Sequence, residues 1–384
     1  MSVTAAQGFL AAGIAAGIKE NGNPDLALVV NSGPRLAAAG VFTSNRVKAA
    51  PVRWSEQVLK GGRVSAVILN SGGANACTGP LGFQDTHATA EKVAEVLDGH
   101  SAAEVAVAST GLIGVRLPMD KLLPGVEKAA AELTGHGGEK AAIAIKTTDS
   151  VHKTAQVTKD GWTVGGMAKG AGMLAPGLAT MLAVLTTDAD VPAEQLDAAL
   201  RAATRATFDR VDSDGCMSTN DTVLLLASGA SGAVPDQDAF AEAVREVCDD
   251  LARQLIGDAE GASKDIRIEV INAAAEDDAV EVGRSIARNN LLKCAIHGED
   301  PNWGRVLSAI GTTAAAFDPD RLNVAINDVW VCRNGSVGED RELVDMRYRE
   351  VRITADLAAG TESAVIWAND LTADYVHENS AYSS

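Results

Sequence analysis

A glycine-rich segment that runs into a short apolar stretch constrains this chain more than any other feature. Within residues 169–182, three glycines allow positive φ and close backbone approach, and one proline fixes a dihedral. Residues 181–185 are apolar but too few for a helix of useful length, so they predict a buried strand. The hydroxyl of Thr180 is therefore expected at the start of a rigid strand, beside a backbone that can bend towards it.

Such a hydroxyl can attack the carbonyl group that precedes it. If Thr180 Oγ attacks the Ala179 carbonyl carbon, an ester forms, and its hydrolysis leaves Thr180 with a free α-amine. An α-amine has an ordinary pKa of about 7.7–8.0, so it can act as a base near neutral pH. The segment therefore predicts self-cleavage between Ala179 and Thr180, which would make one residue both nucleophile and base.

Two other interpretations remain open from these residues alone. A glycine-rich connection before a core strand is an ordinary structural feature that carries no chemistry. A phosphate-binding loop is disfavoured, because the lysine precedes the glycines and no Gly-Lys-Ser/Thr sequence opens a helix.

Five further segments extend the pattern beyond this loop. They are residues 69–79, 109–114, 218–222, 300–305 and 375–384. Together with residues 169–182, and in chain order, they resemble blocks of the ornithine acetyltransferase family, the glutamate N-acetyltransferases of arginine biosynthesis. Members of that family cut themselves before the threonine of an Ala-Thr-Met-Leu sequence, which here is residues 179–182. One departure is the turn at residues 214–217, which is longer and bulkier than the acidic turn of the family.

The resemblance implies an α/β fold of the mixed α+β kind, with layered sheets flanked by helices. This is the self-processing N-terminal-nucleophile fold of ornithine acetyltransferases, shared with aminopeptidase-like relatives. The resemblance also implies that residues 1–179 become an α chain and residues 180–384 a β chain. The two halves would stay intertwined in one two-lobed assembly, and two α and two β chains would form a heterotetramer.

Hydropathy patterns independently predict a mixture of strands and helices. Continuous apolar runs predict buried strands at residues 26–30 and 64–69. Alternating apolar residues predict half-exposed strands at residues 266–270 and 351–355. Helical spacing of apolar residues predicts helices over residues 85–97, after Pro192, and from Phe240 to a stop at Gly257.

The resemblance also assigns residues to the chemistry of acyl transfer. A tetrahedral intermediate needs hydrogen-bond donors for its negative oxygen, and the loss of one donor costs roughly 3–4 kcal/mol. Thr110 and Gly111 match the oxyanion pair of the family, a hydroxyl and a backbone amide. Lys169 matches the lysine beside the nucleophile, where its charge would keep the α-amine neutral or bind a substrate carboxylate. The residues expected to bind substrate are Thr147, Lys169, Thr180, Glu260, Asn379 and Ser384.

Without the resemblance, each of these positions has a simpler interpretation. The adjacent Thr110 and Gly111 are typical of a β-turn, and Lys169 and Glu260 are typical of solvated charges. Residues 379–384 are typical of a frayed terminus.

The resemblance implies a ping-pong acetyltransferase. N2-acetylornithine would acetylate Thr180, ornithine would leave, and glutamate would take the acetyl group to give N-acetylglutamate. Acetyl-CoA is a second donor in some family members, and these residues do not decide whether it is a co-substrate here; no other cofactor is expected. The alternatives are a self-processing amidohydrolase or aminopeptidase, in which water replaces glutamate, and an amino-acid-binding protein that is never cut.

Charge and cysteine content exclude several classes of partner. The net charge of −18 and the lack of a basic stripe argue against nucleic acid and anionic membranes as partners. The five cysteines include no Cys-x-x-Cys pair and the six histidines lack metal-binding spacing, so neither disulfides nor a metal site is expected. With no signal-peptide pattern and no run of about 18 apolar residues, a cytoplasmic protein is expected.

Overall fold

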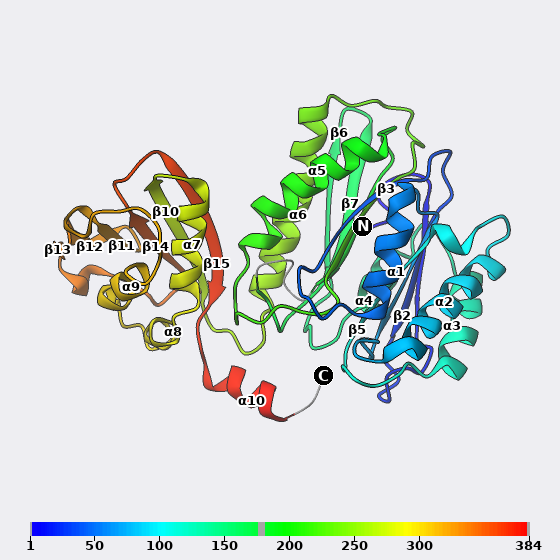
Figure 1. Cartoon of the computed structure of the whole chain (residues 1–384), viewed down its shortest axis with the longest axis horizontal. Coiled ribbons are helices and arrows are strands. Elements are labelled where there is room, and N and C mark those ends of the chain that lie inside the picture. The colour runs from blue at the N-terminus through cyan, green and yellow to red at the C-terminus, as the bar shows by residue number, and fades with distance from the viewer. Residues whose placement is uncertain (1, 176–180, 382–384) are drawn as a thin grey trace.

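The computed structural model describes residues 2–175 and 181–381. Over these residues, two sheets pack face to face with helices on their outer faces, and a third sheet forms a separate lobe (Figure 1). The predicted mixed α/β fold of layered sheets flanked by helices is confirmed. Three predicted site residues, Ala179, Thr180 and Ser384, lie outside the described residues.

The first sheet comes from the N-terminal part of the chain and has the order β1-β2-β4-β5. Its strands are β1 Phe9–Ile14, β2 Leu26–Asn31, β4 Ala66–Ser71 and β5 Val105–Thr110. The helices around it are α1 Ala50–Val58, α2 Gly79–Val96, α3 Met119–Ala131 and α4 Gly138–Ala144. Helices α2 and α3 cover its outer face, where Leu28 and Ile68 share a core with Val93 and Val126. Strands β4 and β5 are parallel, so both end at the same edge of the sheet.

The second sheet, of order β3-β9-β8-β7-β6, contains the strand that follows the glycine-rich segment. Its strands are β3 Ala37–Phe42, β6 Lys153–Lys159, β7 Trp162–Lys169, β8 Leu182–Thr187 and β9 Thr222–Ala227. The inner face packs on the first sheet, and the outer face is covered by α5 Ala193–Ala206 and α6 Gln237–Gly257. Every residue of β8 is buried, which confirms the prediction of a buried strand after the segment.

The third sheet, of order β13-β12-β11-β14-β10-β15, forms the lobe at the left of Figure 1. Its strands are β10 Asp265–Ala273, β11 Asn323–Ile326, β12 Val329–Arg333, β13 Ser336–Val337, β14 Glu350–Asp356 and β15 Glu362–Asn369. Its helices are α7 Glu276–Ala287, α8 Asn290–His297 and α9 Trp303–Ile310. The last helix, α10 Ala373–Ala381, leaves this lobe towards the two packed sheets (Figure 1).

Sequence patterns located the main elements but not all of their ends. The four strands predicted from apolar runs and alternation overlap β2, β4, β10 and β14, and the two later helices are α5 and α6. The helix predicted over residues 85–97 begins at Gly79 instead, six residues earlier. Pro80 lies in its first turn, where a fixed φ suits a helix and no N–H is needed, so the proline starts the helix rather than preventing it.

Several strand ends meet at one edge between the two packed sheets. Lys169, the last residue of β7, pairs with Leu182, the first residue of β8, and Leu182 also pairs with Thr222 at the start of β9. Strand β5 of the first sheet, which ends at Thr110, contacts β8 of the second sheet. This edge therefore brings together chain segments that are far apart in the sequence.

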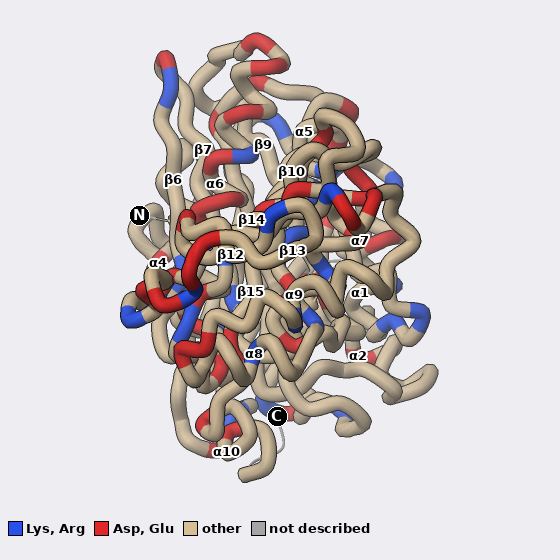
Figure 2. The backbone as a smooth tube through the Cα atoms, turned by 90° about the vertical axis from the view of Figure 1, so that its left-hand side faces the viewer, with Lys and Arg blue, Asp and Glu red and all other residues tan. Residues whose placement is uncertain are grey.

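Charges are mixed along the described chain. In Figure 2, short blue stretches of Lys and Arg and short red stretches of Asp and Glu are scattered over a mostly uncharged tube, and the blue stretches do not gather there into one basic stripe. Within residues 2–175 and 181–381, no helix combines the length and apolar character that crossing a membrane requires.

Candidate active site

One pocket lies at the edge where these strand ends meet. It is lined by all six of the predicted site residues that the structure describes. These are Thr110, Gly111, Thr147, Lys169, Glu260 and Asn379. Residues that sequence reasoning did not assign complete the wall, among them Gly172, Ser218, Thr219 and Asn220.

The backbone just after Thr180 is anchored beside this pocket. The Met181 N–H donates to Asp221 Oδ1 at 3.1 Å, and the Met181 carbonyl accepts from the Thr222 N–H at 3.1 Å. Met181 is 1% exposed. These two bonds therefore fix the backbone at the start of β8. A nucleophile that directly precedes this strand would require such a fixed backbone.

Gly111 follows β5 in a conformation that only glycine adopts without strain. Its φ is +126°, and a Cβ at this position would lie 2.6 Å from the Gly73 nitrogen and 2.7 Å from the Gly72 carbonyl carbon. The Gly73 N–H also donates to the Thr110 carbonyl at 3.0 Å, which holds the two loops together. The turn is therefore tightly packed against the loop that follows β4, and it lines the pocket.

Lys169 is buried, so the interpretation of it as a solvated lysine is wrong. It is 2% exposed, and its Nζ donates to Thr110 Oγ1 at 3.4 Å. Because the hydroxyl oxygen accepts this bond, the hydroxyl proton stays available for an acceptor in the pocket. Burial lowers the pKa of Lys169, and the carboxylate of Asp149 partly offsets that effect.

Behind Lys169 lies a buried ion cluster that the sequence reasoning missed. Lys153 Nζ contacts Asp149 Oδ1 at 2.7 Å and Asp258 Oδ2 at 2.5 Å, and the Lys153 and Asp149 side chains are fully buried. Asp149 also accepts the N–H of Gly170 at 2.6 Å and that of Thr147 at 3.0 Å. The cluster therefore fixes both the start of the glycine-rich segment and the loop that carries Thr147.

The charge of Asp149 is stabilised within this cluster. Burial alone would raise its pKa, but the positive charges of Lys169 and Lys153, with hydrogen bonds from Lys153 and the Thr147 N–H, bring the pKa below its ordinary value. The sequence contained a local indication of Asp149, because this residue follows the predicted site residue Thr147 by two positions. The second carboxylate bound by Lys153, that of Asp258, lies more than 100 residues further along the chain, and no spacing rule connects it to Lys153.

Glu260 and Asn379, which also line the pocket, meet each other. Asn379 Nδ2 donates to Glu260 Oε2 at 3.0 Å, and the Glu260 N–H donates to the Ala171 carbonyl at 3.0 Å. A Cβ on Gly172 would lie within 2.7 Å of the Glu260 carboxylate, so this glycine makes room for the acid. Glu260 is 9% exposed, and the interpretation of it as a solvated acid is therefore wrong.

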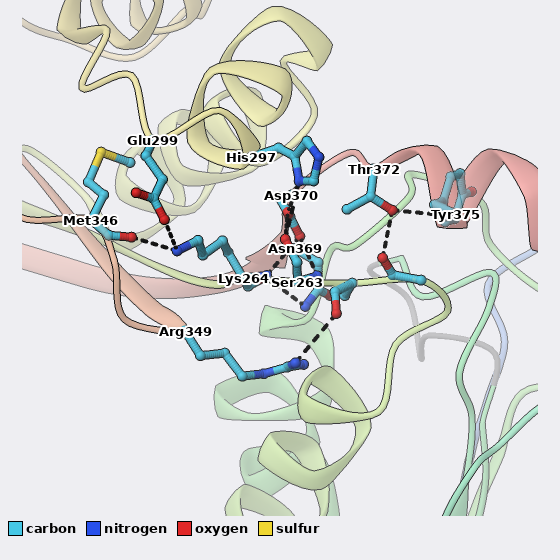
Figure 3. Close-up of polar contacts among 12 residues, drawn as sticks. Ser263, Lys264, His297, Glu299, Met346, Arg349, Asn369, Asp370, Thr372 and Tyr375 are labelled. Carbon is cyan, nitrogen blue, oxygen red and sulfur yellow. Dashed lines mark hydrogen bonds and ion pairs between the residues drawn. The ribbon is translucent and has the colours of Figure 1, made fainter.

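The C-terminal helix is docked rather than frayed as far as residue 381. Figure 3 shows the contacts at its start, where the Thr372 hydroxyl donates to the Gly261 carbonyl at 2.6 Å and accepts the Tyr375 N–H at 2.9 Å. Asp370 accepts the N–H groups of Ser263 and Lys264, each at 2.9 Å. These bonds join α10 to the linker that carries Glu260, which is how Asn379 reaches the pocket.

Asn220, just before β9 of the second sheet, binds the loop that follows β4 and the end of β5 in the first sheet. Its Nδ2 donates to the Ala74 carbonyl at 2.6 Å and to the Ser109 carbonyl at 2.8 Å. Asn220 lies in a segment that resembled the family, but sequence reasoning gave it no role. Among the described residues, no group of three or more His, Cys, Asp and Glu side chains is arranged to hold a metal ion.

Known proteins resemble this chain over its whole length. Residues 10–384 match the ArgJ family. The arginine biosynthesis bifunctional protein ArgJ of Streptomyces avermitilis is 85% identical over 100% of both chains, and that of Thermobifida fusca is 64% identical over 100% of both. A crystal structure of ornithine acetyltransferase complexed with ornithine, from Mycobacterium tuberculosis, is 63% identical over 47% of this chain and 96% of that chain, with a TM-score of 0.46. The chain is an acyltransferase of arginine biosynthesis, and it belongs to the ArgJ family.

Proposed function

We propose that this enzyme transfers the acetyl group of N2-acetylornithine to glutamate through an acetyl-Thr180 intermediate. The observation that carries the proposal is the convergence of six predicted residues on one pocket. The lining of this pocket combines groups suited to acyl transfer with groups suited to an amino-acid substrate. The names of the curated relatives, which place them in arginine biosynthesis, support the same substrate class.

In the first half of the reaction, Thr180 Oγ attacks the acetyl carbonyl carbon. The C–N bond then breaks, ornithine leaves with the proton, and the acetyl group remains on Thr180 as an ester. In this proposal the Thr110 hydroxyl and the Gly111 amide, which both line the pocket, donate to the oxygen that becomes negative. Lys169 contacts Thr110 and adds positive charge beside that oxygen.

In the second half, the amine of glutamate attacks the same ester carbon and releases Thr180. The α-amine of Thr180 acts as the base that takes the proton of the incoming amine. A nearby positive charge on Lys169 favours the neutral form of this amine. Glu260 and Asn379 offer an acceptor and a donor for the polar ends of the substrate.

Self-cleavage would give an α chain of residues 1–179 and a β chain of residues 180–384. Strands β3, β6 and β7 precede this cut and strands β8 and β9 follow it, yet all five share one sheet. The two products would stay hydrogen-bonded to each other and remain one folded unit. We further propose that two such units associate into a heterotetramer, which analytical ultracentrifugation of the cut protein would measure.

A radiolabelled donor separates this proposal from the hydrolase alternative. With N2-[acetyl-14C]acetylornithine, label should pass to N-acetylglutamate at a rate that requires glutamate, and the β chain should gain one acetyl group in intact mass spectra. Release of free labelled acetate at a rate independent of glutamate would contradict the proposal and favour an amidohydrolase.

The relatives are named bifunctional, which motivates a second donor for this enzyme. We propose that acetyl-CoA also acetylates Thr180, so that glutamate is acetylated without N2-acetylornithine. Release of free CoA thiol in the presence of glutamate measures this activity directly. Its absence would leave the enzyme with the single transfer reaction.

Replacing Thr110 by valine should lower kcat by about 10²–10³-fold, because one oxyanion donor is lost while the side-chain shape is kept. KM should change less, since the donor acts on charge that develops in the transition state. Steady-state kinetics with both substrates would measure the two constants. The control is Thr110→Ser, which keeps the hydroxyl and should keep most of the rate; equal losses in both variants would contradict the assigned role.

A further inference from the structure

Self-cleavage needs a proton-transfer group that acetyl transfer does not need. The α-amine proposed as the base of the mature enzyme does not exist before the cut, because its nitrogen is still part of a peptide bond. As the ester bond forms, Thr180 Oγ must lose a proton, and as the C–N bond breaks, the Thr180 nitrogen must gain one. A group other than this amine therefore has to relay the proton.

We propose that the carboxyl group of Asp221 relays the proton in the self-cleavage step, an inference that rests on the proposed function. Asp221 directly precedes β9, which runs parallel to β8 in the second sheet. This register places it beside the first residues of β8, and hence beside the residue that follows Thr180 in the sequence. No role was assigned to Asp221 from the sequence.

The two oxygens of Asp221 differ in their surroundings. Oδ1 accepts the Met181 N–H at 3.1 Å. Oδ2 is buried and has no hydrogen-bond partner within residues 2–175 and 181–381. The nearby Thr43 hydroxyl does not satisfy it, because that hydroxyl donates to the Ser218 carbonyl at 2.7 Å. One oxygen is thus anchored to the strand after the cleavage point, and the other is left for a further contact.

The environment of Asp221 favours the protonated carboxyl. The residue is 1% exposed, and this burial raises its pKa well above the ordinary range. The Met181 N–H and the charge of Lys169 oppose the effect without reversing it. The titratable groups that face it are Lys169 from β7 and Cys216 from the loop before β9.

A protonated carboxyl can donate from one oxygen and accept at the other. Asp221 gives its proton to the Thr180 nitrogen as the Ala179–Thr180 C–N bond breaks. It regains a proton from Thr180 Oγ as the new C–O bond forms, so the ester and a neutral amine result and Asp221 is unchanged. Water then hydrolyses the ester, which frees the Ala179 carboxylate and the Thr180 hydroxyl.

The other acids and bases of the pocket have different contacts. Lys169 donates to Thr110 Oγ1. Glu260 lies over Gly172 and accepts from Asn379. Asp221 binds the backbone N–H of Met181, the residue that follows Thr180.

The test is the substitution Asp221→Asn in the full-length chain. Asparagine keeps an acceptor for the Met181 N–H and nearly the same volume, but it cannot exchange a proton. Cleavage of freshly made protein, followed by denaturing gel electrophoresis, should be at least about 100-fold slower than in the wild type. The matched control is Asp188→Asn, at the other end of β8, where a 2%-exposed carboxylate accepts the Thr163 N–H at 2.8 Å. This control should cleave within about threefold of the wild-type rate.

Hydroxylamine identifies the blocked step, because it attacks an ester and leaves a hydroxamate on the fragment that ends at Ala179. The folded Asp221→Asn chain should yield no such hydroxamate in intact mass spectra, whereas the wild type should. Hydroxamate formation at the wild-type rate, or unchanged cleavage in Asp221→Asn, would overturn the inference. A wild-type chain that is never cut would instead overturn the proposed function.

If Asp221→Asn does not fold, the wild-type pH profile provides the test. The reactive form of Asp221 is protonated, so the cleavage rate should fall as the pH rises through its raised pKa. Asp221→Glu, which retains a carboxyl group, should keep part of the rate and the same descending limb. A wild-type rate that rises steadily with pH over that range would contradict the proposal.

Discussion

Replacing Thr180 by alanine should leave one uncut chain of 384 residues and lower the transferase rate by roughly 10⁴-fold or more. The variant lacks the hydroxyl that attacks Ala179, and the α-amine therefore stays within a peptide bond. Nucleophile and base are both lost through one side chain, so the effect exceeds that of any oxyanion donor. Denaturing gels, intact mass and release of ornithine from N2-acetylornithine would measure cleavage and turnover separately.

The matched variant is Thr180→Ser, which retains a hydroxyl on the same backbone. It should still give fragments 1–179 and 180–384, at a reduced rate, and should still carry an acetyl group on the second fragment. If Thr180→Ala is cut at the same bond, or keeps transferase activity, the nucleophile has been assigned to the wrong residue.

Replacing Lys153 by methionine should lower the free energy of unfolding by about 3–5 kcal/mol. Methionine fills a similar volume but leaves two buried carboxylates, Asp149 and Asp258, without their shared cation. Lys159→Met is the matched control, because this lysine ends the same strand and its pair with Glu246 is more than one-third exposed at both partners. That exposed pair contributes only about 0–1 kcal/mol. Urea unfolding in the uncut Thr180→Ala background would measure both losses on a single covalent chain.

The destabilisation caused by Lys153→Met should depend on pH. The pKa of Asp149 is lower in the folded protein than its ordinary value of 3.8, so its contribution is complete above that value and is lost as the pH falls below it. The difference between the two chains should therefore shrink in acid. A difference that is the same at pH 7 and pH 3, or equal losses for Lys153→Met and Lys159→Met, would contradict the role of the cluster.

The sequence predicted elements whose hydropathy pattern reflects their burial. Strands β2, β4 and β8 are buried along their whole length, so their sequences are continuous apolar runs. Strands β10 and β14 expose alternate residues and show alternation. Lys153 was not predicted as buried, because it begins a strand of mixed polarity, and a lysine in such a place is usually solvated.

The family resemblance predicted most residues of the candidate site, but it did not predict which of their charged groups are buried. Thr110, Gly111, Thr147, Lys169, Glu260 and Asn379 were named from motifs, and the structure brings them to one pocket. The burial of Lys169 and Glu260 could not be predicted, because burial depends on which distant segments cover a side chain. Asp221 and Asn220 were overlooked, although both lie in a segment that had been recognised.

The sequence by itself determined the local requirements of this protein: a hydroxyl before an apolar strand, glycines where the backbone must bend, and the order of the elements. Those properties depend on neighbours along the chain. Only the tertiary structure decided that β5, β7, β8 and β9 meet at one edge, that Lys153 joins Asp149 to Asp258, and that Asp221 is buried beside Met181. Distances between remote segments, and the low dielectric that shifts their pKa values, exist only after the two sheets have packed together.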